Sequence, residues 1–186
     1  MWNRFVSLVF VVACGPPNPG KDTDGLGSGE DTDSTGLPAD CKSGGPFADV
    51  GTGETTFLPL SDGADLMLVF GSQGGWHLTT AVQVSAASPL VSFHPTASTV
   101  DDGTHVSGDQ VAEYRELVPY EQASCAGTAT NLRVFLDGSD PVHACSLRDR
   151  LVEITMEVMD LQTDVAIFAT RRVTVRGDPN DASTCP

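Results

Sequence analysis

The sequence predicts an all-β protein whose strands pack as an antiparallel β-sandwich. Apolar residues make up 40% of the 186 residues and aromatic residues only 6%, while 19 glycines and 12 prolines supply many turns. Toward the C-terminus, apolar and polar residues alternate with period two, which is the pattern of a strand with one buried face. Many short strands are therefore favoured over long helices.

The chain begins with the parts of an export signal. Arg4 precedes a mostly apolar run of nine residues from Phe5 to Ala13. A transmembrane helix needs about 20 residues, so this run is too short to span a membrane. A buried strand at this point would run directly into the turn-forming sequence GPPNPG. We therefore expect residues 1–13 to be a signal peptide.

The end of this signal resembles the lipobox of bacterial lipoproteins. Val11, Val12 and Ala13 stand directly before Cys14. In that family the cysteine is acylated and becomes the first residue after cleavage, and two or more acyl chains anchor a protein stably. The resemblance implies lipidation of Cys14, and Gly15 after it implies the outer membrane of a Gram-negative cell. An ordinary secretory signal is the alternative, and either face of the membrane stays open.

Residues 14–40 are expected to be the lipidated cysteine followed by a disordered acidic tether. The stretch 15–40 contains six acidic residues and one basic residue, and Leu26 and Leu37 are its only sizeable apolar residues. It cannot bury enough apolar surface to offset the entropy of ordering. The later stretch FGSQGGWHLTTAVQV resembles one found in uncharacterised Gram-negative lipoproteins, which carry similar acidic Thr/Asp/Gly linkers.

The pattern changes from Cys41 onward, where short β-branched and apolar runs alternate with Gly, Asp, Pro and Ser. We expect one domain over residues 41–186. Its predicted strands are 55–60, 64–71, 77–86, 90–93, 105–114, 131–136, 151–160 and 165–176.

The last two predicted strands form a hairpin through a turn at residues 160–164. In the first of them, apolar and polar residues alternate along LVEITMEVMD. Pairing across the hairpin places Glu153 and Glu157 near the arginines of the second strand, which are Arg171, Arg172 and Arg176. The hairpin resembles the end of an immunoglobulin-like sandwich, with Trp76 as a core tryptophan. A jelly roll or a small barrel fits the strand count nearly as well.

Four cysteines remain if Cys14 carries lipid. An even number in an exported domain implies two disulfides. Three pairings are possible, and we favour Cys125 with Cys145 and Cys41 with Cys185. The second of these pairs would join the first and last residues of the domain.

The sequence contains no strong catalytic or cofactor motif. A formal charge of −15 disfavours nucleic acid as a partner. Ser72 in GSQGG lacks the spacing of a nucleophile elbow. The histidines lie 17, 11 and 38 residues apart, so they form no local metal-ligand pair. Copper proteins of sandwich fold draw their ligands from Cys, His and Met, and His143, Cys145, Met156 and Met159 resemble that ligand set. The order differs, because in that family the Cys precedes the His and Met, whereas here His143 precedes Cys145. We expect no cofactor, no metal and no enzymatic activity.

The most distinctive local sequence is FGSQGGWHLTTAVQV, where a glycine turn precedes Trp76 and His77. The two residues point to opposite faces of a strand, so one of them could contact a ligand. The alternative places Trp76 in the core and His77 hydrogen-bonded at the sheet edge. We expect a membrane-anchored binding or adhesion module for a protein or glycan. A structural or assembly role, or copper binding, are the alternatives.

Overall fold

The computed structural model describes residues 45–71, 75–108, 112–136 and 144–177. The predicted signal peptide 1–13, Cys14 and the tether, and also Cys41 and Cys185, lie outside these residues. The described part is almost entirely β-strand, which confirms the all-β prediction. Within it, no helix has the length and apolar character needed to cross a membrane.

The described residues form ten strands, five of them of ten residues or more. They are β1 Phe47–Thr52, β2 Leu58–Pro59, β3 Ala64–Phe70, β4 Trp76–Ser85, β5 Leu90–Thr99, β6 Glu113–Glu116, β7 Tyr120–Glu121, β8 Ala126–Phe135, β9 Leu151–Asp160 and β10 Val165–Gly177.

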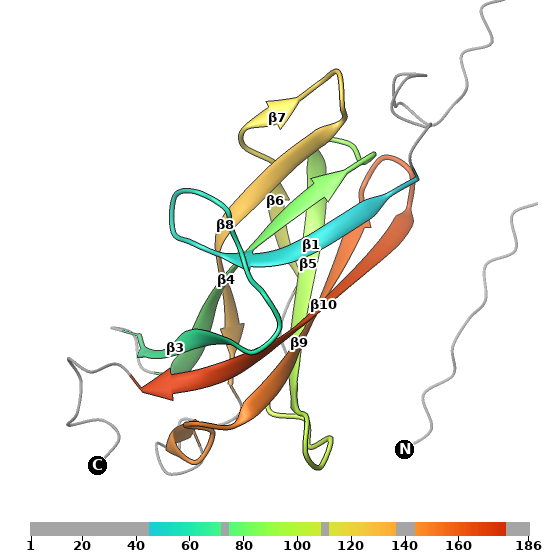
Figure 1. Cartoon of the computed structure of the whole chain (residues 1–186). Coiled ribbons are helices and arrows are strands. Elements are labelled where there is room, and N and C mark those ends of the chain that lie inside the picture. The colour runs from blue at the N-terminus through green and yellow to red at the C-terminus, as the bar shows by residue number, and fades with distance from the viewer. Residues whose placement is uncertain (1–44, 72–74, 109–111, 137–143, 178–186) are drawn as a thin grey trace, which may run out of the picture. The chain divides into compact units, whose positions relative to one another are not determined.

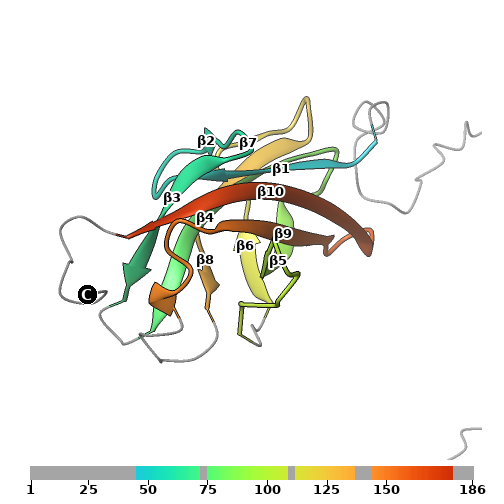
Figure 2. The ribbon, with the colours of Figure 1, turned by 60° about the horizontal axis from the view of Figure 1, so that its bottom comes forward.

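All ten strands belong to one hydrogen-bonded sheet that curls on itself (Figure 1). The main path runs β2-β1-β4-β3-β10-β9-β5-β6. One edge of β4 pairs with β8, and its other edge is shared between β3 and β1. Strand β10 joins the halves, because its first part pairs with β9 and its last part pairs with β3 (Figure 2). The pairing of β10 with β3 is parallel, whereas the other paired strands are antiparallel.

One core fills the inside of the curl. Side chains from β1, β3, β4, β5, β8, β9 and β10 belong to a single buried apolar cluster. Strand β9 shows the predicted alternation, since Val152, Ile154, Met156 and Val158 are fully buried while the residues between them are partly exposed. Fully burying a side chain of this kind contributes about 1.5–3 kcal/mol.

The continuous curled sheet differs from the predicted sandwich of two separate antiparallel sheets. The immunoglobulin-like detail is therefore not confirmed, and the β3/β10 pair is an exception to the predicted antiparallel pairing. A strand was expected over 105–114. Of its described residues, 105–108 contribute isolated bridges at His105 and Ser107, and β6 begins at Glu113. Strands β1 and β7 were not predicted.

The hairpin of β9 and β10 has the predicted turn, closed by a hydrogen bond from the Asp164 amide to the Asp160 carbonyl. Arg172 lies opposite Glu153, and its Nε is 3.0 Å from a carboxylate oxygen of Glu153, as predicted. Glu157 behaves differently from the prediction, because it pairs with His94 of β5 and lies opposite Phe168 of β10.

Candidate functional site

Trp76 and His77 open strand β4 and point to opposite faces of the sheet. The indole of Trp76 lies in the core with 3% of its surface exposed, and its ring centroid is 5.1 Å from that of Phe70. Trp76 is therefore a core residue, which was the alternative prediction for it, and not an exposed ligand contact. Of the two residues, only His77 is placed to face a ligand.

His77 lies on the outer face of the sheet but is itself buried, with 6% of its surface exposed. Val69 and Phe135 flank it on the neighbouring strands, and the Phe135 ring is 5.9 Å from the imidazole. Its Nδ1 is closed off from solvent and has no hydrogen-bond partner among the described residues. The predicted hydrogen bond of His77 at the sheet edge is therefore absent for this nitrogen.

His77 lies in a hollow of about 380 Å³ on the outer face of β3, β4 and β8. This volume is within the range of about 300–1,000 Å³ that is usual for small-molecule sites. We call it the His77 hollow. Its described lining combines polar and aromatic side chains from three strands and one loop, namely Glu54, Val69, Phe70, Gly71, Gly75, His77, Thr79, Asn131, Arg133 and Phe135.

Glycine shapes one end of the hollow. A Cβ atom at Gly71 would lie 3.6 Å from Cε1 and 3.7 Å from Nδ1 of His77, so the missing side chain leaves this edge of the imidazole uncrowded. Gly75 closes the turn by accepting a hydrogen bond from the Gly71 amide, and it has a φ of 108°, which favours glycine.

The loop after β1 forms the opposite end of the hollow. The Asn131 amide donates to the Gly53 carbonyl at 3.0 Å, and the Thr130 hydroxyl donates to the Glu54 carbonyl at 3.1 Å. Asn131 has a left-handed backbone, with a φ of 55°, which asparagine tolerates better than most residues. These contacts hold the loop against β8 and keep Glu54 at the rim.

Arg133 supplies the positive charge of the hollow. Most of the other described arginines pair with carboxylates: Arg115 with Glu113, Arg150 with Asp101 and Asp102, Arg171 with Asp49, Arg172 with Glu153, and Arg176 with Asp65 and Asp149. Arg133 forms no ion pair within the described ranges. Burial lowers the pKa of His77, and the charge of Arg133 lowers it further, so the imidazole is neutral at pH 7.

A second hollow of about 440 Å³ adjoins the first. Asn131, Arg133 and Phe135 line both of them, and the second hollow continues toward Glu113 and Arg115 of β6. The guanidinium of Arg133 therefore lies at the junction between two hollows that together cross strand β8.

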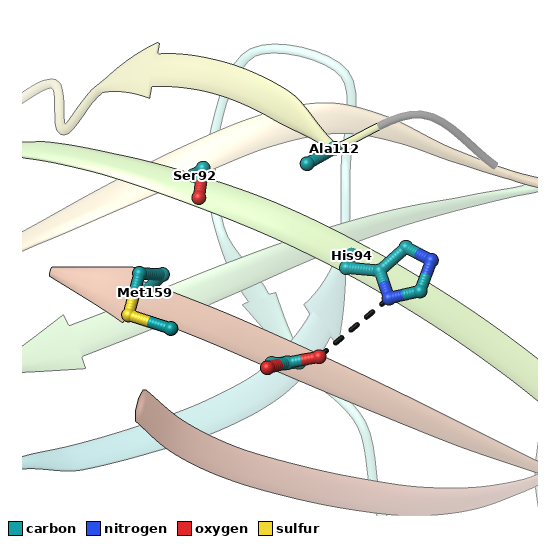
Figure 3. A pocket seen from close by; sticks show the side chains of 5 residues that line it. Ser92, His94, Ala112 and Met159 are labelled. Carbon is teal, nitrogen blue, oxygen red and sulfur yellow. Dashed lines mark ion pairs between the residues drawn. The ribbon is translucent and has the colours of Figure 1, made fainter. Parts of the chain in front are cut away.

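A third hollow, of about 290 Å³, lies on the outer face of β5 and β9 (Figure 3). It contains His94 and Glu157, with 3.5 Å between Nδ1 and a carboxylate oxygen. Ser92 lies two residues from His94 on the same strand, and such residues are about 6.6 Å apart along a strand. No hydrogen bond joins Ser92 to His94 in the described structure, so this hollow does not have the geometry of an activated serine.

The other predicted site residues are not brought together. No three His, Cys, Asp or Glu side chains gather to hold a metal ion in the part of the chain that the structure describes. In the copper hypothesis, Met156 is buried in the core, Met159 lines the hollow of His94, and His143 lies outside the described residues. Cys125 is fully buried and Cys145 packs against the core, while their pairing with each other stays a prediction.

Arg133, Phe135, Asn131 and Glu54 were not singled out from the sequence. In NLRVFL, the alternation of Asn131, Arg133 and Phe135 with Leu132 and Val134 does indicate an outward face. The missing information is the register, because only pairing with β4 places Phe135 beside His77 and Arg133 beside Thr79.

Comparisons with known proteins give a distant likeness to a solved structure. No protein-family model matches the chain, and no curated protein matches it. Among solved structures, the chain is similar to the CooA pilin subunit from enterotoxigenic Escherichia coli, at 12% identity and a TM-score of 0.33. The likeness covers 72% of this chain and 99% of the pilin chain.

Proposed function

We propose that this protein is a lipid-anchored, non-enzymatic binding module of the outer membrane, and that the His77 hollow is its ligand site. The observation that carries the proposal is the buried, neutral imidazole of His77, which lies beside the partly exposed ring of Phe135 and in the same hollow as Arg133, an arginine without an ion pair among the described residues. Convergent polar groups in a hollow with aromatic walls are typical of a ligand site.

The chemistry of the hollow supports binding in preference to catalysis. In hydrolases, a carboxylate bonded to histidine Nδ1 orients the imidazole toward a nucleophile. Nδ1 of His77 has no such partner among the residues described. The imidazole, Arg133 and Asn131 instead offer hydrogen-bonding groups that suit the recognition of a polar ligand.

The anchor is the second part of the proposal. Val11, Val12, Ala13 and Cys14 resemble a lipobox, and the acidic tether after them would hold the domain near the membrane while leaving it free to reorient. A module that captures a ligand at a surface benefits from this arrangement, because tethering raises its local concentration there.

Site-specific photocrosslinking in cells tests the ligand site. A photoreactive phenylalanine analogue replaces either Phe135, which is 45% exposed in the hollow, or Phe168, which is 63% exposed on β10. We expect a discrete crosslinked species from position 135 and none from position 168. Equal labelling from both positions, or no species from position 135, would contradict the proposal.

A further inference from the structure

We infer that the His77 hollow recognises an acidic sugar residue of the uronic acid type, and that Arg133 binds its carboxylate. This inference rests on the proposed function and names the ligand class for the same site.

Arg133 is unusual in this acidic protein, because its charge is not paired with a carboxylate among the described residues. The chain has 25 acidic residues against 10 basic ones, so an arginine on its surface has many possible partners. Arg133 has no carboxylate partner within the described structure, although Glu54 lines the same hollow. A guanidinium presents a planar fork of N–H donors that matches a carboxylate in two parallel hydrogen bonds. A carboxylate on the ligand would complete this fork.

The side chains around Arg133 suit a sugar ring. Phe135, which is 45% exposed, and Val69 flank the imidazole and provide apolar surface for the C–H face of the ring. Thr79, Asn131 and Glu54 line the same hollow. Thr79 and Asn131 can both donate hydrogen bonds to ring hydroxyls and accept them, whereas the carboxylate of Glu54 can only accept them. An uncharged His77 adds to this polar set without placing a second positive charge beside Arg133.

The strands beneath the hollow disfavour a peptide as the ligand. Extended peptides bind by adding a strand to an open sheet edge. Below the hollow, His77 of β4 is paired with Val69 of β3 on one side and with Phe135 of β8 on the other. Both edges of β4 are therefore occupied here, so a peptide cannot bind by adding a strand to β4 below the hollow.

The surrounding charges limit the ligand to few negative groups. Glu54 lies at one end of the His77 hollow, and in the adjoining hollow Arg115 is neutralised by Glu113. The net charge of −15 repels a dense polyanion as well. One carboxylate at Arg133, followed by an uncharged sugar in the adjoining hollow, fits this distribution of charge.

The test compares two sugars that differ in one group. Methyl β-D-glucuronide and methyl β-D-glucoside are titrated into the full chain in detergent by calorimetry. We expect the glucuronide to bind about tenfold more tightly, since one charged, bidentate hydrogen bond separates the two ligands. Arg133→Gln should remove this preference, and Arg133→Lys should retain part of it, because lysine keeps the charge without the fork.

Two further variants separate local from general effects. Arg172→Gln removes one positive charge from the exposed ion pair with Glu153, far along the sheet order from β8, and should leave the preference intact. Gly71→Ala places a methyl group in contact with the His77 imidazole, and should weaken both sugars while leaving the circular dichroism spectrum unchanged.

Equal binding of the two sugars, no binding of either, or a preference that survives Arg133→Gln would overturn the inference. Tighter binding of N-acetylphenylalanine than of the glucuronide would also overturn it, in favour of a peptide carboxylate. These results leave the proposed function standing if the crosslink from position 135 is found. Absence of that crosslink counts against the proposed function itself.

Discussion

The imidazole of His77 gives the folded domain a predictable sensitivity to acid. Burial, and then the charge of Arg133, lower its pKa below the ordinary value of 6.5. The unfolded chain therefore takes up the proton first as the pH falls. The stability linked to the neutral imidazole is complete above about pH 6.5 and decreases as the pH falls through 6.5 toward the lowered folded pKa.

Urea unfolding at pH values of about 7.5 and 5.5 measures this linkage. The wild type should lose more stability between these pH values than His77→Phe, which has no proton to bind at this position. His94→Gln is the matched control and should retain the wild-type loss, because His94 is a partly exposed histidine on a different strand, β5. An equal loss in wild type and His77→Phe would contradict the prediction.

Asp160 is the most buried carboxylate of the described structure, with 2% of its surface exposed. Burial alone would raise its pKa, but hydrogen bonds outweigh burial and lower the pKa below 3.8. The donors are the amide and hydroxyl of Ser88, at 2.8 and 2.6 Å, and the amides of Gln162 and Thr163.

Asp160→Ala should lower the free energy of unfolding by about 3 kcal/mol at pH 7, since it leaves several buried donors without an acceptor. The wild type should lose the carboxylate's contribution only as the pH falls below 3.8 through the lowered folded pKa. Chemical denaturation measures both effects. A loss within about 0.5 kcal/mol, as for an ordinary surface substitution, would show that the hydrogen bonds do not stabilise the fold.

The hairpin of β9 and β10 allows a comparison of its two faces. Ile154 is fully buried, whereas Glu153 is partly exposed and pairs with Arg172. Ile154→Ala should lower the free energy of unfolding by about 2–5 kcal/mol, because it leaves a cavity in the core. Glu153→Gln should cost only a few tenths of a kcal/mol, as expected of an exposed pair. Equal costs in denaturation experiments would contradict the assignment of the faces.

Strands with strict alternation were predictable from the sequence, and strands defined by their neighbours were not. Strand β9 was predicted with both of its bounds, because Val152, Ile154, Met156 and Val158 repeat with period two. Strand β5 was predicted to end at Phe93. It continues to Thr99, because β9 pairs with it from Val91 to Thr99.

The site was predictable only in part, for a related reason. The glycine turn indicated an unusual position for His77, and this residue does line a hollow. The choice between Trp76 and His77 depended on which face of β4 meets the core, and two bulky residues in succession leave that open. Arg133 and Phe135 are separated from His77 by more than 50 positions, so only the register of β8 against β4 brings them together.

At the scale of the whole molecule, the lipobox interpretation predicts that Cys14 decides where the domain is found. Cys14→Ala should move the protein from the membrane fraction to the soluble fraction, because no other segment of the leader is long enough to span a bilayer. Fractionation followed by immunoblotting measures the distribution, and mass spectrometry shows whether acyl chains are present. Retention of Cys14→Ala in membranes would contradict the lipobox interpretation.

The remaining cysteines make a further prediction about the whole domain. We expect Cys125–Cys145 and Cys41–Cys185 bonds, and the shorter loop should stabilise the domain by about 3 kcal/mol in the chain-entropy model. Proteolytic peptide mapping without reduction identifies the pairs. A peptide that joins Cys41 to Cys125 would show that the pairing is wrong.

The parallel pairing of β3 with β10 determines when the fold can be completed. Arg176 of β10 and Asp65 of β3 are in contact although they are 111 positions apart in the chain. A ribosome or a translocation channel releases β3 long before β10, so β3 must wait with one edge unpaired. Loop-closure entropy makes such distant pairings slow to form. The sheet therefore cannot be completed until β10 has emerged. Until then the unpaired edge of β3 must be protected from pairing with other chains.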